Sequence, residues 1–166
     1  MSQIAIISDS HDNPARIDQM LEILKKKTIK TIIHCGDVCS FRVLNYLSKN
    51  FKGKVYLSIG NVDADHEINE ERNNLANLKI FPKFGELEID NIKIAFVHFP
   101  NKAKELGETG KHDFVFYGHT HKPWEEKWNN TKILCSGNIA SIYFMPTFAI
   151  IDTMSLKAQL ILLNEK

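Results

Sequence analysis

The sequence has few cysteines and few arginines, and it contains no long apolar run. Three cysteines, Cys35, Cys39 and Cys135, are an odd number and too few for a disulfide-dense scaffold, so we expect reduced thiols and a cytoplasmic protein. The apolar segment Ile4 to Ile7 is too short for a signal peptide, and no run approaches the roughly 20 residues of a membrane span. We therefore expect no membrane partner.

An excess of charge is also absent, because 21 basic residues stand against 20 acidic ones. Binding to nucleic acid or to a membrane surface would call for a clustered surplus of Lys and Arg, and the sequence gives no such footprint. The only basic run, Lys25 to Lys27, is interpreted as the last turn of a helix, where it complements the helix dipole. At 166 residues the chain is within the usual size of one domain, and we predict a single domain over residues 1–166.

Strand and helix patterns alternate in the first half of the chain. Apolar runs at 3–8, 30–34 and 54–59 predict strands buried on both faces. Asn13-Pro14 begins a helical pattern that ends at the Lys run, and Ser40 caps a second one. The polar segment 67–78 is predicted as a further helix. Three alternations indicate βαβ units and a parallel sheet.

The second half has shorter elements. Residues 84–89 and 92–97 flank Asp90-Asn91, which is a hairpin signal. A short helix is expected at 101–108, followed by a strand at 113–117. The segments that remain have the appearance of short antiparallel strands, at 124–128, 133–135, 146–152 and 157–163. Two sheets within one domain are the simplest account.

Side chains that can bind metal follow five of these strands, directly where each strand ends. They are Asp9 and His11, Asp37, Asn61, His98, and His119 with His121. An open α/β sheet carries its functional loops at this position. Taken singly, each has another interpretation: the carboxylates could cap helices, the Asn could serve a turn, and His98 could be a hydrogen-bonded core residue. Their succession at five strand ends favours a metal centre.

The motifs around these residues resemble those of a known family. Asp9-Ser10-His11, Gly36-Asp37, Gly60-Asn61, His98 and Gly118-His119-Thr120-His121 occur in the order of the calcineurin-like metallophosphoesterases. From Ile4 to about Asp152 the chain is similar to the small YfcE/MJ0936-type phosphodiesterase subgroup of that superfamily. The resemblance implies an α/β fold, a four-layer sandwich of two mixed β-sheets flanked by helices. It is also compatible with a homo-oligomer.

The resemblance further implies a ligand set for two metal ions. One ion would be held by Asp9, His11 and His121, a second by Asn61, His98 and His119, and Asp37 would bridge both. Imidazole, carboxylate and amide ligands without sulfur suit Mn²⁺, which we place first, or Ni²⁺, Zn²⁺, Fe²⁺ or Co²⁺, and they argue against a structural zinc site.

The charge of such a centre favours an anionic guest. Two divalent ions outweigh two carboxylates even when a hydroxide bridges them, so phosphate is the natural ligand. A two-metal site with ions about 3.5–4 Å apart lowers the pKa of the bridging water and holds the hydroxide in line with phosphorus. We predict a metal-dependent phosphodiesterase for a small phosphodiester or nucleotide-like substrate, with Asp37, Asn61 and His98 at the catalytic positions.

Three segments depart from the family pattern. Val62 stands where many relatives have His, a candidate general acid, and such an acid contributes roughly 10²–10⁴ in rate. Slow turnover of poor leaving groups is expected unless Asp63, Asp65, a water or a substrate group substitutes. Phe99-Pro100 replaces a Gly that often precedes another His, and Cys135 to Asn138 replaces a common Asn-Pro-Gly-Ser.

Other functions remain open. The lost acid would also suit a catalytically weak or inactive scaffold of the same fold, such as the retromer subunit, which binds through an apolar surface. A phosphomonoesterase or nucleotide pyrophosphatase could use the same metals, but a monoester dianion favours extra cationic clamps, and the chain has only three Arg.

Two groups of side chains could contact a substrate. Arg42 could reach a phosphate, but an exposed helix residue is the preferred interpretation. The aromatic residues of the C-terminal third could form a nucleobase platform, but we expect them in the core or at a dimer interface; they are Trp124, Trp128, Tyr143 and Phe144.

Overall fold

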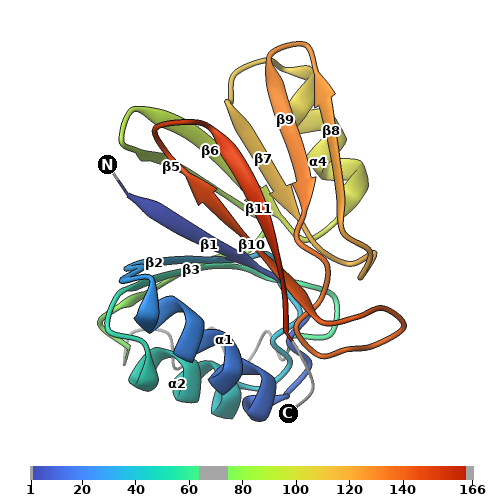
Figure 1. Cartoon of the computed structure of the whole chain (residues 1–166). Helices are drawn as coiled ribbons and strands as arrows, with labels where there is room; N and C mark the ends of the chain where they lie inside the picture. The colour runs from blue at the N-terminus through green and yellow to red at the C-terminus, as the bar shows by residue number, and fades with distance from the viewer. Residues whose placement is uncertain (1, 64–74, 164–166) are drawn as a thin grey trace.

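The computed structural model describes residues 2–63 and 75–163, which form two β-sheets with helices on their outer faces (Figure 1). The first sheet has six strands in the order β11-β10-β1-β2-β3-β4. Strands β1 to β4 run parallel to one another. Strand β10 pairs antiparallel with β1, and β11 pairs antiparallel with β10. The bounds are β1 (Gln3–Ile7), β2 (Thr31–His34), β3 (Lys54–Ser58), β4 (Leu78–Phe81), β10 (Thr147–Asp152) and β11 (Lys157–Leu162).

The second sheet has five strands in the order β5-β6-β7-β9-β8. Its three central strands are parallel, and its two outer strands are antiparallel to their neighbours. Asp90 and Asn91 join the first two strands with φ of 53° and 65°, as a tight hairpin requires. The bounds are β5 (Phe84–Ile89), β6 (Ile92–Val97), β7 (Phe114–Tyr117), β8 (Trp124–Trp128) and β9 (Thr131–Cys135).

The described helices are α1 (Pro14–Lys26), α2 (Phe41–Asn50) and α4 (Pro100–Glu108). The side chain of Asn13 accepts a hydrogen bond from the backbone N–H of Arg16, and the side chain of Ser40 accepts one from Val43, so α1 and α2 both begin where the sequence predicts a cap. Within the described part of the chain, every helix is too short or too polar to cross a membrane.

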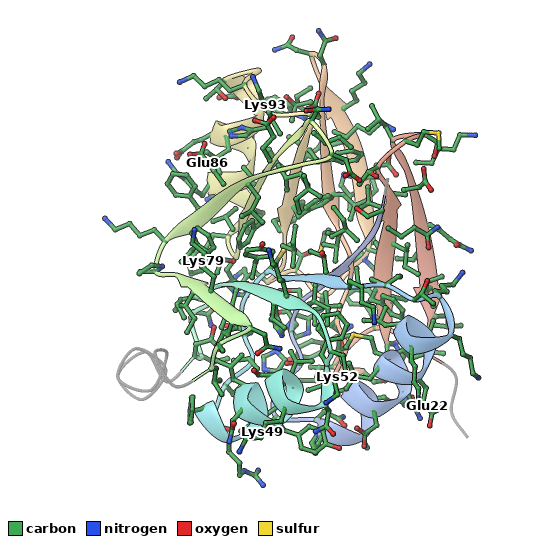
Figure 2. All side chains as sticks on the ribbon, turned by 90° about the vertical axis from the view of Figure 1, so that its left-hand side faces the viewer. Glu22, Lys49, Lys52, Lys79, Glu86 and Lys93 are labelled. Carbon is green, nitrogen blue, oxygen red and sulfur yellow. The ribbon has the colours of Figure 1, made fainter. Side chains whose placement is uncertain are left out.

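Apolar side chains fill the spaces between four layers. Helices α1 and α2 cover one face of the first sheet, the second sheet packs on its other face, and α4 covers the outer face of the second sheet (Figure 1). Alternate residues of β1 show why its whole run is apolar: Ala5 and Ile7 face the helices, whereas Ile4 and Ile6 face the second sheet. Charged side chains such as Lys49 lie outside these layers (Figure 2). The predicted fold, two mixed sheets flanked by helices, is confirmed.

Two predictions of secondary structure need correction. The predicted helix at 67–78 falls mostly on residues outside the described part of the chain, but Leu78 begins strand β4 instead of ending a helix. Its short apolar run, Leu78 to Phe81, becomes a strand because β3 offers it a parallel partner. Strand β9 was expected to be antiparallel, and it is so only toward β8, because it pairs in parallel with β7.

Candidate metal centre

Three ligands from both sheets form the first group. Asp9 and His11 follow β1, and His121 follows β7. The Nε2 atoms of His11 and His121 are 3.3 Å apart, and the Oδ1 atom of Asp9 lies 3.8 Å from the first and 3.2 Å from the second. Asp9 is fully buried and His121 nearly so, while His11 is partly open to solvent.

A second group gathers beside it. Nε2 of His98 lies 3.3 Å from Oδ2 of Asp37 and 3.2 Å from Nδ1 of His119. Oδ1 of Asn61 is 2.9 Å from the same His98 nitrogen and 3.0 Å from the same His119 nitrogen. Asn61 and His119 are exposed, whereas Asp37 and His98 are buried, so this group is open on one side.

Asp37 joins the two groups. Its Oδ2 atom faces His98 in the second group and lies 4.0 Å from Nε2 of His11 in the first. The structure therefore brings together all seven residues singled out in the sequence, with this carboxylate between two sets of ligand atoms.

The free positions on these side chains fit divalent cations. Among the described residues, Asp9 Oδ1 is buried without a hydrogen-bond partner, which is costly unless a cation lies near it. The Nδ1–H of His98 donates to the carbonyl of Cys35 at 2.8 Å, and that of His121 donates to Ile142 at 3.2 Å. These bonds hold Nε2 of both rings toward the centre, the arrangement of metal-binding histidines.

The backbone around the centre is strained. Five of the seven side chains belong to residues with positive φ: Asp9 (52°), His11 (40°), Asp37 (60°), His119 (69°) and His121 (58°). Few residues other than glycine adopt this conformation, and such strain gathers at functional sites. The surrounding hydrogen bonds hold it in place, among them Asp9 N–H to the carbonyl of Gly36 and His11 N–H to that of Asp37.

The comparison with protein families shows the superfamily of the chain. The model of the calcineurin-like phosphoesterase superfamily domain matches residues 2–155. The chain belongs to this superfamily. The prediction of a metal-dependent phosphoesterase is confirmed, and divalent metals are the cofactors of the superfamily.

Relatives of known name and structure agree with this assignment. The chain is 30% identical over 158 residues to phosphodiesterase MJ0936 of Methanocaldococcus jannaschii, covering 91% of this chain and 93% of that protein. A solved structure of an archaeal phosphodiesterase superimposes with a TM-score of 0.88 at 28% identity, covering 97% of this chain and 99% of that one. The phosphoesterase YfcE of E. coli shares the fold, with a TM-score of 0.67 at 15% identity over 98% of this chain and 100% of that one.

Burial and charge shift the pKa values of the candidate ligands in opposite directions. Burial by itself would raise the pKa of Asp37, but the hydrogen bond and positive charge of His98 outweigh it, so that the pKa is lowered. Burial likewise acts to lower the pKa of His98, and the contact with Asp37 raises it overall. The contact with the Asp9 carboxylate, 3.2 Å from Nε2, raises the pKa of His121. The carboxylates thus favour positive charge in this centre.

Sequence reasoning missed the role of Asp63. Its carboxylate, considered above as a substitute acid, accepts backbone hydrogen bonds from four residues and is buried. The donors are Asp37 (3.0 Å), Val38 (2.6 Å), Cys39 (2.8 Å) and Gly60 (2.7 Å). Asp63 therefore shapes the loop that carries Asp37, and both of its oxygens are already occupied as acceptors. Asp65, the other carboxylate considered, lies outside the described residues.

His34 contacts the loop that carries Asp9 and His11. It is fully buried in β2, and its Nε2 atom lies 3.0 Å from the hydroxyl of Ser10, between the ligands Asp9 and His11. Burial lowers the pKa of His34 to about 4, so the ring is neutral and can accept a hydrogen bond from the Ser10 hydroxyl. The expectation of a buried, hydrogen-bonded histidine is confirmed.

The aromatic residues of the C-terminal third are more exposed than expected. Trp124, Tyr143 and Phe144 are all exposed, whereas Trp128 packs partly against the cluster beneath α4. Core burial is therefore wrong for the first three. Arg42, as expected, is an exposed residue in the first turn of α2.

Proposed function

We propose that this protein is a dinuclear metal-dependent phosphodiesterase, in which water attacks phosphorus in line with the leaving oxygen. The observation that carries the proposal is the position of Asp37, whose Oδ2 atom faces both ligand groups. When bound, two divalent ions, with Mn²⁺ the first candidate, lower the pKa of a water and neutralise the phosphoryl oxygens.

The candidate ligands form a buried floor and an exposed side of the site. Asp9, Asp37 and His98 form the floor, where low exposure keeps water away from the charges. Asn61 and His119 stand at the exposed side, where a phosphoryl group would enter. The hydrogen bond of His98 to Cys35 fixes the ring so that Nε2 always faces the site.

The charges around the centre favour a diester. Among the described residues, the ion pairs of Asp9 and Asp37 are formed with histidines alone. A monoester dianion would call for additional Lys or Arg contacts, whereas a diester carries one charge less. The identity with a protein named as a phosphodiesterase supports the same choice. Because Val62 is 45% exposed and carries no acid, we expect good leaving groups to react fastest.

A scaffold function has one observation in its favour. Four apolar side chains are exposed in β11 and the turn before it: Met154, Leu156, Leu160 and Leu162. Such a surface suits contact with another protein or with a second copy of the chain. A scaffold, however, has no use for seven converging ligands, so we place this alternative second.

Hydrolysis of bis(p-nitrophenyl) phosphate by metal-stripped protein tests the proposal. Mn²⁺, Ni²⁺, Co²⁺, Zn²⁺ or Mg²⁺ is added back in separate reactions, and Asp37→Ala and His98→Ala are measured beside the wild type. The p-nitrophenolate group leaves without an acid, so the assay reports on the metal centre itself. We expect turnover that depends on metal and falls by at least about 10³-fold in both variants.

The control is His112→Gln. This histidine contacts Glu86 at 2.8 Å and belongs to neither ligand group, so its loss should leave turnover unchanged. Turnover that survives Asp37→Ala would refute the proposal. No turnover of the wild type with any metal would replace it with the scaffold function.

A further inference from the structure

An aromatic ring lies beside the second ligand group. Phe99 follows His98 directly, and its ring centroid is 5.0 Å from the His98 ring and 5.3 Å from the His119 ring. Pro100 begins α4 at the next position, which restricts the backbone of Phe99 to an extended conformation. The ring is nevertheless 42% exposed, so it is held in place with one face open.

A second ring lies beside the first ligand group. Tyr143 is 90% exposed, and its ring centroid is 5.7 Å from that of His121. Its backbone is strained, with φ of 63°, which is costly for a bulky residue. An aromatic side chain held so openly in a strained position calls for a reason other than packing.

The loop that carries Tyr143 is tied to the metal ligand. The side chain of Asn138 donates to the carbonyl of His121 at 3.1 Å and accepts the N–H of Ile142 at 2.8 Å. The carbonyl of Ile142 in turn accepts from Nδ1 of His121 at 3.2 Å. The backbone next to Tyr143 and the candidate ligand His121 are therefore held as one unit, which places Tyr143 beside the site.

Each ring thus lies beside one of the two ligand groups at which phosphorus would react. A phosphodiester carries two ester substituents, which leave phosphorus in different directions once its free oxygens are bound. We propose that Phe99 and Tyr143 bind these substituents, and that the site selects diesters of flat aromatic groups, such as aryl or nucleobase-bearing esters, over dialkyl esters. This inference rests on the metal centre of the proposed function.

Ring contact explains such a preference physically. Offset or edge-to-face packing of aromatic rings adds to the burial of apolar area, and stacking against a protein ring accepts any base because every base has a π-face. The side chain of Val62, which follows the candidate ligand Asn61 in the chain, is also apolar and exposed. The selectivity is therefore for a class of substituent and not for one base.

Equilibrium binding tests the inference independently of turnover. Diphenyl phosphate and dimethyl phosphate carry the same charge, and their dissociation constants for the Mn²⁺-loaded protein are measured by titration calorimetry. We expect diphenyl phosphate to bind at least about 10-fold more tightly. Phe99→Ala and Tyr143→Ala should each weaken diphenyl phosphate binding several-fold and leave dimethyl phosphate unchanged.

Conservative variants identify the rings as the cause. Tyr143→Phe keeps the ring and should retain tight binding, whereas Phe99→Leu keeps apolar volume but loses the ring and should not. Met154→Ala removes an exposed apolar side chain at the opposite end of β10 and serves as the control for general effects. Equal binding of the two diesters, or equal losses for both in the ring variants, would overturn the inference.

The two proposals fail in different ways. Turnover of bis(p-nitrophenyl) phosphate without any preference for diphenyl phosphate would overturn the aromatic selection and keep the phosphodiesterase. A preference that disappears in the ring variants, in a protein without turnover, would support the aromatic site and remove the phosphodiesterase.

Discussion

At the scale of single residues, one carboxylate outside the candidate ligand set binds the backbone of the loops that form the centre. The two oxygens of Asp63 have about four acceptor positions, and four backbone N–H groups occupy them. Three of the donors lie in the loop after β2 and the fourth, Gly60, in the loop after β3. Asp63 therefore holds the backbone of Asp37 in register with that of Asn61.

Asp63→Asn tests this role with almost no change of shape. An amide offers two donors where the backbone needs acceptors, so N–H groups are left unpaired at a cost of about 1–3 kcal/mol each. We expect a lower free energy of unfolding for the metal-free protein, measured in urea. We also expect metal affinity to fall by about 10- to 100-fold in titrations, as for other supports of metal ligands.

Glu105→Gln is the matched control for the loss of one carboxylate. Glu105 is exposed and pairs with Lys102 in α4, so stability should change by less than about 0.5 kcal/mol and metal affinity should be unchanged. If Asp63→Asn binds metal as the wild type does, the loop does not depend on this carboxylate.

The contrast between Asp63 and the ligands shows what the sequence reveals about single residues. Each ligand stands directly after an apolar strand, and strand ends of a parallel sheet meet at one edge, so their gathering could be predicted. Asp63 has no such signal, because three of its four partners belong to a loop 24 to 26 residues earlier in the chain. Tyr143 was named as a possible platform residue but expected in the core or at a dimer interface, and its exposed position beside His121 could not be predicted for the same reason, since Asn138 ties its loop to His121.

At the scale of elements, the turn after β7 passes very close to the loop after β1. A Cβ on Gly118 would overlap the hydroxyl of Ser8 and lie 2.9 Å from Oδ2 of Asp9. The same Asp9 oxygen accepts the N–H of His119 at 3.1 Å. Because Gly118 has no side chain, the loops of the two sheets can approach each other at the metal centre and leave room for the Asp9 carboxylate.

Gly118→Ala should therefore damage the centre more than the fold. We expect a destabilisation of about 1–3 kcal/mol from overpacking, together with a large loss of metal affinity because Asp9 is displaced. Urea unfolding and metal titration measure the two effects. Gly110→Ala is the comparison, since this glycine follows α4 with φ of 63° and has no atoms within 4 Å of a Cβ.

In the comparison variant only the backbone is strained. It should lose about 1 kcal/mol of stability and no metal affinity. Equal metal affinity in the two variants would contradict the close approach at Gly118.

Elements with a strong period or a cap were predicted well, and elements that depend on a partner were not. The runs that became β1, β2 and β3, and the caps Asn13 and Ser40, are signals within a few residues. Strand β4 has four residues, and its assignment depends on hydrogen bonds to β3. The parallel pairing of β9 with β7 depends on β8 forming an outer strand. No local sequence pattern predicts that position of β8.

At the scale of the whole molecule, each ligand group takes side chains from both sheets. Asp9 and His11 extend from the first sheet toward His121 of the second. In the other group, Asp37 and Asn61 of the first sheet meet ligands that follow β6 and β7 of the second. A bound ion would therefore tie the sheets together, and metal binding should stabilise the entire fold.

This coupling predicts a rise in the thermal midpoint when metal is restored. A ligand at 100 times its dissociation constant stabilises the folded state by about 2.7 kcal/mol for each site. For a chain of this size we expect about 5–10 °C for each occupied site, measured by calorimetry of metal-stripped protein with and without Mn²⁺. Asp37→Ala should lose most of the rise, since this carboxylate faces both groups.

His112→Gln separates the centre from other metal-binding side chains. The histidine that it replaces lies in neither ligand group. The metal-free variant should therefore have a different thermal midpoint from the wild type but show the full rise with Mn²⁺. The same rise in Asp37→Ala as in the wild type would place the stabilising ion elsewhere on the protein. No rise in the wild type at millimolar Mn²⁺ would mean that the ligands of the two sheets do not hold an ion jointly.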